Sequence, residues 1–137
     1  IGGEKGRLLK KGDLLQWESA LSDKMTIPIY RGPEFDLLTD LSKFQLSENQ
    51  YKIGSDSNRM GARVEGEPLT SSSYQLSYSA PVLPGFIQLP PSGLPIVVLQ
   101  DGQTTGGYPR IAYIRPQELS AFNQIPLGGS FKFKLEN

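Results

Sequence analysis

Glycine and proline interrupt this chain at such short intervals that many short strands are favoured over long helices. Fifteen glycines and eleven prolines make 26 of the 137 residues, roughly 19% against about 12% in average proteins. Between these breaks lie runs rich in β-branched and aromatic residues, as is typical of strands. We predict strands at residues 26–31, 51–54, 62–65, 85–89, 95–100, 110–115 and 130–135.

The last of these runs has the clearest strand pattern. Phe131, Phe133 and Leu135 alternate with Lys132 and Lys134, so the apolar side chains point to one face and the lysines to the other. This alternation predicts an antiparallel strand with one buried face.

Two segments have the spacing of helices instead. A short amphipathic helix is predicted at residues 34–44, where apolar side chains recur at intervals of three or lie beside that stripe: Phe35, Leu37, Leu38, Leu41 and Phe44. Pro116 favours a second helix, because proline is well tolerated at the first helical position. Leu119, Phe122 and Ile125 share one face of this helix, and Pro126 marks its end.

Seven or eight strands and two short helices fit a mainly β architecture, one closed or nearly closed antiparallel β-barrel. A β-sandwich is the alternative, and spacing alone does not separate the two. The length of 137 residues corresponds to about one domain, and 37% hydrophobic residues are enough for one core. The polar, Ser-rich segment 67–80 predicts a mobile loop.

Cysteine and histidine are absent from the sequence, which narrows its chemistry. Without them there is no disulfide, no thiolate or imidazole metal site, no cysteine nucleophile and no Ser-His-Asp triad. Any proton transfer falls to Asp, Glu, Lys, Tyr or a bound substrate.

Charge and hydropathy give no sign of a nucleic-acid or membrane partner. Fourteen Lys and Arg balance fourteen Asp and Glu, so the formal net charge is zero. The longest aliphatic run, residues 96–99, is far shorter than the roughly 20 residues that span a bilayer. No signal-peptide pattern opens the chain, and we expect a cytoplasmic protein. Because the chain begins at Ile1 and not at Met, we also expect a fragment or a processed chain.

The segment 54–61 (GSDSNRMG) is the first candidate for a site. Small polar residues lead to Arg59, whose planar guanidinium can bind a carboxylate through two hydrogen bonds, with Asn58 and Ser57 in support. The alternative is a hairpin loop whose Asp and Asn side chains satisfy local backbone groups, and spacing alone favours this alternative.

The second candidate is the segment 101–109 (DGQTTGGYP), which follows the most hydrophobic strand. Thr104, Thr105, Gly106 and Gly107 combine two hydroxyls with an adaptable backbone, and such a stretch can turn several N–H groups toward one oxyanion, phosphate or ureido oxygen. No Gly-Lys-Ser/Thr follows, so this is not a Walker loop. A tight turn explains the composition about equally well.

The third candidate is the segment 84–95 (PGFIQLPPSGLP), in which Gln88 lies between Ile87 and Leu89. This alternation places Gln88 on the interior side of the barrel or at the mouth of a pocket. A stiff turn between strands is the stronger alternative here, because proline and glycine are abundant. Neither Met25 nor Met60 lies in an Ala-Met-Lys-Met-like setting, and nothing indicates that biotin is attached to this chain.

Three motifs together resemble a known family. They are SDSNRMGARVEG, PGFIQLPPSGLPIVVLQDGQTTGGYPRIAYI and LSAFNQIPLGGSFKF, which occur in the order found in the carboxyltransferase-type proteins. GRLLKKGDLLQW and IYRGPEFDLLT are similar to the middle region of that family. Its members include allophanate hydrolase subunit 2, the third subunit of bacterial 5-oxoprolinase, the antagonist of a sporulation-kinase inhibitor (KipA) and the carboxyltransferase domain of urea carboxylase.

The resemblance covers nearly the whole chain, which is similar to the C-terminal half of longer family members. It implies one cyclophilin-like β-barrel domain over residues 1–137, acting as a subunit in ATP-dependent amide or lactam hydrolysis (5-oxoproline or a urea-derived substrate) or in carboxyl transfer. The implied partners are a missing N-terminal domain and a companion subunit of the inhibitor or allophanate-hydrolase-subunit-1 type. No covalently bound cofactor and no metal are expected, and ATP or carrier-borne biotin would act through the assembly.

The same resemblance implies roles for the candidate residues. Arg59 would hold a carboxylate or carboxyphosphate-like group, and Asp101 would orient Arg59 or take a proton. The stretch Thr104–Gly107 would stabilise charge on an amide or ureido oxygen. The remaining candidates would contact the substrate or form the rim of its pocket: Asn58, Gln88, Gln103 and Tyr108. These roles require Arg59 and the 101–108 loop to share one cavity.

Two positions depart from the family pattern. Asn58 stands where the family commonly has aspartate, and Gly102 stands where it commonly has arginine after Asp101. The loss of these two charges slightly favours the alternative of a non-catalytic regulatory protein that complexes and antagonises a kinase inhibitor. A third hypothesis is an inactive barrel that self-associates through the surface left exposed by its absent half.

Overall fold

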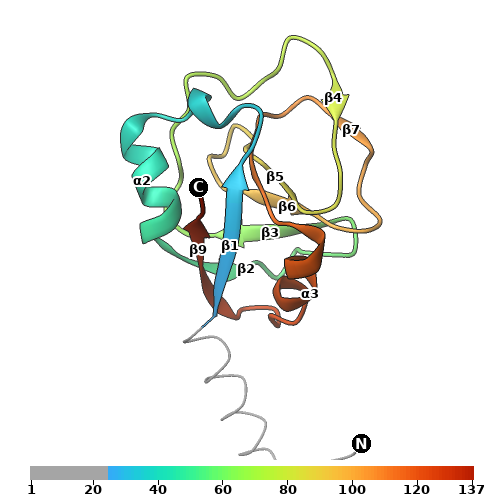
Figure 1. Cartoon of the computed structure of the whole chain (residues 1–137). Helices are drawn as coiled ribbons and strands as arrows, with labels where there is room; N and C mark the ends of the chain where they lie inside the picture. Colours follow the sequence, from blue (N-terminus) through green and yellow to red (C-terminus); the bar gives the residue numbers. More distant parts are fainter. Residues whose placement is uncertain (1–24) are drawn as a thin grey trace, which may run out of the picture.

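Seven strands close into a barrel in the computed structural model, which describes residues 25–137 (Figure 1). The similarity at residues 6–17 lies outside the described residues. Around the barrel the order is β1-β8-β5-β6-β3-β2-β9. The strands are β1 (Thr26–Arg31), β2 (Gln50–Ile53), β3 (Gly61–Glu65), β5 (Phe86–Gln88), β6 (Ile96–Val98), β8 (Arg110–Tyr113) and β9 (Ser130–Leu135). The ends of each strand lie within two residues of the ends predicted for it. The predicted β-barrel is confirmed, and the alternative of a β-sandwich is wrong.

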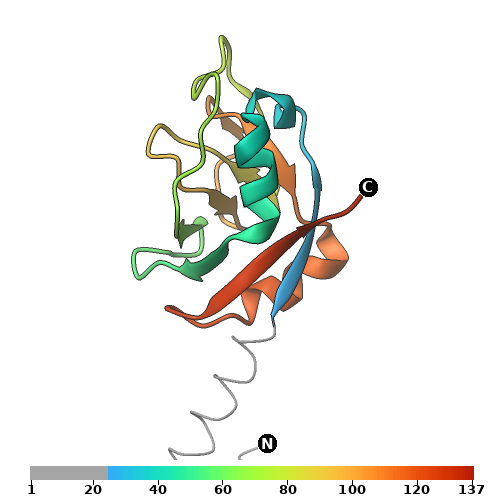
Figure 2. The same ribbon diagram turned by 90° about the vertical axis from the view of Figure 1, so that its left-hand side faces the viewer.

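One of the seven pairings is parallel. β1 pairs with β9 in the parallel sense, with Thr26 opposite Lys132 and Ile29 opposite Leu135, whereas the other six pairings of the barrel are antiparallel. The cause is parity, since an odd number of strands cannot alternate direction all the way round a closed ring. The parallel pair also brings the first and last strands of the described chain side by side (Figure 2).

The barrel interior is filled by the inward side of each strand. On β9, Phe131 and Phe133 are buried while Lys132 and Lys134 are exposed, which confirms the alternation predicted for this strand. The rings of Phe131 and Phe133 meet edge to face with centroids 5.1 Å apart, and Tyr51 of β2 packs 5.5 Å from Phe133. Such aromatic contacts contribute beyond the apolar area that they bury.

The second predicted helix is confirmed as α3 (Pro116–Asn123). Pro116 occupies the start of the helix, as expected. Phe122 is buried, and its ring meets that of Phe131 edge-on at 5.5 Å. Ile125, just beyond the helix, is also buried. The apolar face of α3 therefore packs on the core near the first residues of β9.

The helix predicted at residues 34–44 is wrong in position. A short 3-10 turn, η2 (Phe35–Leu37), is followed by a separate helix, α2 (Asp40–Glu48). The break lies at Thr39, whose hydroxyl accepts a hydrogen bond from the N–H of Ser42 and caps the new helix. Because α2 begins afresh here, Leu41 and Phe44 face solvent, at 65% and 63% exposed.

The Ser-rich segment is an irregular loop, as predicted, and specific contacts hold it on the barrel. The Ser71 hydroxyl lies 2.7 Å from the carbonyl oxygen of Ser73 and 3.1 Å from that of Leu37, and its one hydrogen can be donated to either. The Thr70 N–H donates to the Ser42 hydroxyl on α2, and Leu69 is buried. The segment ends in β4 (Ala80–Pro81), which pairs with β7 (Thr105–Gly106). Sequence patterning missed this two-stranded ribbon because each strand has only two residues.

None of the helices between residues 25 and 137 combines the length and apolar character needed to cross a membrane.

We predict that Gly85→Ala destabilises the barrel far more than Gly128→Ala. Both glycines have positive φ, +97° and +78°, but a Cβ on Gly85 would lie 2.4 Å from the carbonyl oxygen of Ile114, whereas a Cβ on Gly128 would meet nothing within 4 Å. We expect losses of about 3 and about 1 kcal/mol in the free energy of unfolding, measured by urea denaturation. Equal losses would contradict the steric argument.

Candidate functional site

The turn between β2 and β3 is built by its small polar residues. The side-chain oxygen of Asn58 accepts hydrogen bonds from the N–H groups of Met60 (2.8 Å) and Gly61 (3.3 Å). The Ser57 hydroxyl both accepts from the Arg63 N–H and donates to the Arg63 carbonyl. Arg59 projects from this turn with 89% of its side chain exposed. Asn58 therefore has the structural role that the hairpin alternative gave it, Ser57 adds to the same turn, and the Arg59 guanidinium is left exposed.

The turn that follows β6 docks directly on the Arg59 turn. The N–H of Leu99 donates to the carbonyl of Met60 (3.1 Å), and the N–H of Asp101 donates to the carbonyl of Arg59 (3.2 Å). Arg59 Nε also lies 3.1 Å from Asp101 Oδ2. An exposed ion pair contributes at most about 1 kcal/mol, so the backbone bonds set this position. The two turns predicted to converge do meet.

Gly102 allows this close approach. A Cβ at this position would lie 2.6 Å from the Met60 carbonyl oxygen and 2.7 Å from Cγ1 of Val98, closer than van der Waals contact permits. A side chain here would force the two turns apart, because the obstructing groups are backbone and a packed strand residue.

Arg59 and Asp101 belong to a cavity of about 410 Å³ at one end of the barrel, called here the barrel-end cavity. Its polar lining includes Asn58, Arg59 and Asp101. Its apolar lining comes from the β2–β3 hairpin, the end of β6, and α3 with the residues after it: Ile53, Ala62, Leu99, Phe122, Ile125 and Leu127. A single guanidinium beside an apolar hollow suits a small carboxylate with an apolar body.

A second cavity of about 240 Å³ lies on the outer side of β3, β5 and β6, and we call it the outer-face cavity. Gln88, Gln103 and Tyr108 line it, and Asn58 lines both cavities. The structure therefore divides the predicted site residues into two groups that adjoin at Asn58. Amide and hydroxyl groups dominate the second group, and they can donate hydrogen bonds to an amide or ureido oxygen.

Thr104–Gly107 lines neither cavity. Thr105 and Gly106 form β7 and pair with β4, and the carbonyls of Thr104 and Gly107 accept hydrogen bonds from Val82 and Leu76. Positive φ among the described glycines occurs at Gly85, Gly93 and Gly128. The segment is therefore part of a ribbon and not the nest of N–H groups predicted.

Gly106 has a packing role beside the outer-face cavity. A Cβ on Gly106 would lie 2.6 Å from Nε2 of Gln88, so the glycine makes room for the Gln88 carboxamide. The β4–β7 ribbon therefore packs against the Gln88 side chain, and the ribbon itself does not line the outer-face cavity.

An ion pair that sequence reasoning missed holds this ribbon. Arg110 and Glu34 form a bidentate pair, with Nη2–Oε1 at 2.7 Å and Nε–Oε2 at 2.9 Å, and Arg110 Nη1 donates to the carbonyl of Pro81 in β4. Their side chains are only 12% and 15% exposed. The hydrogen bonds from Arg110 hold the pKa of the Glu34 carboxyl below its ordinary value of 4.5. The partners are 76 positions apart, so no local pattern could have joined them.

In the part of the chain that the structure describes, no three carboxylates, histidines or cysteines gather as metal ligands. The side-chain donors of the two cavities are the guanidiniums of Arg59 and Arg63, the Ser57 hydroxyl, carboxamides and a phenol. Arg63 is paired with Asp56 at 3.6 Å. This donor set fits an organic carboxylate or amide.

Comparison with known proteins places this geometry in a family. The protein-family model described as the carboxyltransferase domain, subdomains A and B, matches residues 1–135 of this sequence. The chain belongs to this family. It is 38% identical over 145 residues to the C subunit of 5-oxoprolinase from Escherichia coli (strain K12). It is 35% identical over 145 residues to the C subunit of 5-oxoprolinase from Haemophilus influenzae (strain ATCC 51907 / DSM 11121 / KW20 / Rd).

The two alignments cover 97% and 98% of this carboxyltransferase domain and 47% of each relative, so the chain spans about half the length of the relatives it matches. The crystal structure of Kluyveromyces lactis urea carboxylase has the same fold, with a TM-score of 0.76 and 21% identity over 82% of this chain and 11% of that chain. At this identity the likeness concerns the fold alone.

The two departures from the family pattern now have a physical description. An aspartate at position 58 could accept the same two backbone hydrogen bonds as Asn58, so the turn tolerates either residue. Gly102 differs more, because the arginine expected there would need the two turns to separate. In this chain Gly102 lets the 99–102 turn pack closely against the Arg59 turn.

We predict that Glu34→Gln lowers the free energy of unfolding by about 3 kcal/mol at neutral pH, because it leaves Arg110 partly buried without its counter-charge. Asp36→Asn is the matched control, since the Asp36–Lys43 pair is 3.1 Å long but its carboxylate is 89% exposed; we expect a loss below about 1 kcal/mol.

The effect of Glu34 depends on pH in a defined direction. Because its pKa is lower in the folded state than its ordinary value of 4.5, its stabilising contribution is complete above about pH 4.5 and is lost as pH falls through the folded-state pKa. The difference between wild type and Glu34→Gln should shrink toward acid in denaturation curves. A difference that is constant down to about pH 2 would contradict this linkage.

Proposed function

We propose that this carboxyltransferase domain binds an amide or lactam that carries a carboxylate, and that it does so as part of a multi-subunit hydrolase or carboxyl-transferring enzyme. One observation carries the proposal: the Arg59 turn and the 99–108 loop meet, so that a guanidinium and a set of amide and phenol donors adjoin at Asn58. Both relatives are named as subunits of 5-oxoprolinase, which supports a lactam as the substrate.

Each cavity has its own task in this proposal. Arg59 binds the substrate carboxylate, and Asp101 orients the guanidinium from its Nε side. Gln88, Gln103 and Tyr108 contact the amide and stabilise the negative charge that grows on its oxygen as the C–N bond opens. One well-placed donor of this kind is worth about 3 kcal/mol in the transition state. We assign no substrate contact to Thr104–Gly107, which lines neither cavity.

The rest of the chemistry belongs to other parts of the assembly. Arg59 is paired with Asp101, so the barrel-end cavity suits one carboxylate better than a triphosphate, and we propose that ATP is held elsewhere. The outer-face donors would also suit the ureido group of carrier-borne biotin. Since the chain spans 47% of its relatives, we propose that the remaining half and a companion subunit complete the site around the exposed Arg59.

The test is ATP-dependent 5-oxoproline hydrolysis by the assembly with its partner subunits, comparing wild type with Arg59→Ala and Arg59→Lys. We expect Arg59→Ala to raise KM about 100-fold, because a charged, bidentate contact is lost. Arg59→Lys keeps the positive charge but loses the two parallel N–H donors of the guanidinium, and we expect it to raise KM about tenfold.

Lys52→Gln is the matched control, because Lys52 is an exposed cation on β2 that lines neither cavity. Its KM should stay at the wild-type value. If Arg59→Ala hydrolyses 5-oxoproline with wild-type kinetics, Arg59 is not the carboxylate-binding group and the proposal fails.

A further inference from the structure

A row of aromatic side chains crosses the outer face of the barrel. None of these side chains lines the barrel-end cavity or the outer-face cavity. Tyr30 of β1 is opposite Tyr113 of β8, and Tyr113 is opposite Phe86 of β5. We call these three residues the aromatic row. Glu136 extends it beyond β1, because its N–H donates to the carbonyl of Ile29 and so sets it beside Tyr30.

The rings of the aromatic row are close enough to act as one surface. The centroids of Tyr30 and Tyr113 are 5.4 Å apart with a 30° tilt, and those of Tyr113 and Phe86 are 6.2 Å apart. The Arg115 guanidinium lies 4.4 Å above the Tyr30 ring and is paired with Glu118 at 2.8 Å. These contacts fix the orientation of Tyr30, and all three rings are only half-buried.

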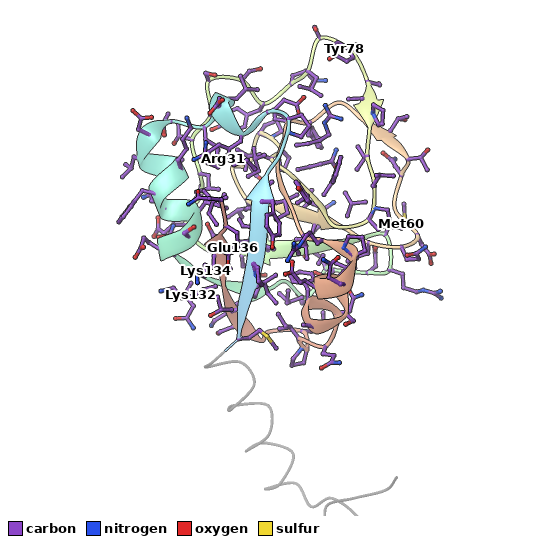
Figure 3. All side chains as sticks on the ribbon, viewed as in Figure 1. Arg31, Met60, Tyr78, Lys132, Lys134 and Glu136 are labelled. Carbon is purple, nitrogen blue, oxygen red and sulfur yellow. The ribbon has the colours of Figure 1, made fainter. Side chains whose placement is uncertain are left out.

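A cavity of about 560 Å³ lies against this row, lined by Tyr30, Arg31, Tyr113, Glu136 and Asn137. Arg31 is exposed, and no carboxylate of residues 25–137 lies within ion-pair distance of it. The Glu136 carboxylate is 3.9 Å from Lys134 Nζ. Figure 3 shows Arg31 and Glu136 beside β1, with Met60 of the outer-face cavity on the other side of the view.

We propose that this cavity is a second ligand site, for a small molecule with a planar ring and one carboxylate. Tyr30 and Tyr113 offer a surface on which a planar ring can stack. Arg31 offers a guanidinium whose fork matches a carboxylate. Glu136 lies at the same cavity and repels a second negative charge, so a monoanion fits better than a polyanion.

The competing explanation is that the rings only support pairing between strands, as cross-strand aromatic pairs commonly do. That explanation accounts for the ring contacts. It does not require Arg31 and Glu136 to border the cavity, and it predicts no preference among ligands. The ligand preference therefore separates the two.

The experiment titrates the chain of residues 1–137 with three probes and follows the aromatic NMR signals of Tyr30 and Tyr113, assigned through Tyr→Phe variants. Benzoate has both the ring and the charge, cyclohexanecarboxylate keeps the charge without the planar ring, and benzyl alcohol keeps the ring without the charge. We expect millimolar binding of benzoate, at least about fivefold tighter than binding of the other two.

Arg31→Gln should weaken benzoate binding about tenfold, because the charged hydrogen bonds are lost. Arg31→Gln also removes the contact of the guanidinium with the Phe35 ring, whose centroid is 5.1 Å away, so denaturation curves should show only a small loss of stability. A large loss would indicate a folding defect. Arg59→Gln should leave benzoate binding at these tyrosines as in wild type, because the two sites share no lining residue.

Equal binding of the three probes, or benzoate binding unaffected by Arg31→Gln, would overturn the proposal. Either result would leave the proposed function untouched, because the proposed function depends on Arg59 and the 99–108 loop.

Discussion

Closure of a seven-stranded barrel through one parallel pair is the constraint on which the rest of this structure depends. The pairing of β1 with β9 joins the two ends of the described chain and leaves the barrel without an open edge. Once closed, the barrel has an inside filled by rings such as Phe131 and Phe133 and an outside free for polar groups. The candidate cavities then lie at one end of the barrel and on its outer face, where connecting turns meet.

The arrangement around Arg59 depends on backbone contact more than on charge. Two backbone hydrogen bonds and the close approach at Gly102 hold the two turns together, while the Arg59–Asp101 pair is too exposed to do so. Opening the Arg59–Asp101 pair would therefore leave the two turns in place, which the proposed binding of a substrate carboxylate requires.

The outer-face cavity is supported by the opposite kind of interaction, a largely buried ion pair. The largely buried Glu34–Arg110 pair reaches β4 through the Pro81 carbonyl, and β4 holds β7, whose Gly106 lies against Gln88. A structural ion pair is thus connected to a candidate ligand group through the ribbon. The ribbon thus positions one part of the proposed site. Because the chain spans about half the length of its relatives, we propose that other parts of the assembly complete that site.

The sequence by itself determined the strands, the helix that begins at Pro116 and the family, because alternation, proline placement and ordered motifs are local properties. It misplaced the helix near Thr39, since capping by one hydroxyl outweighed the spacing of Leu41. Only the tertiary structure decided the parallel pair, the β4–β7 ribbon, the pairing of Glu34 with Arg110 and the division of the site into two cavities. Each of these joins residues far apart in the chain, and no periodic pattern encodes which distant groups meet.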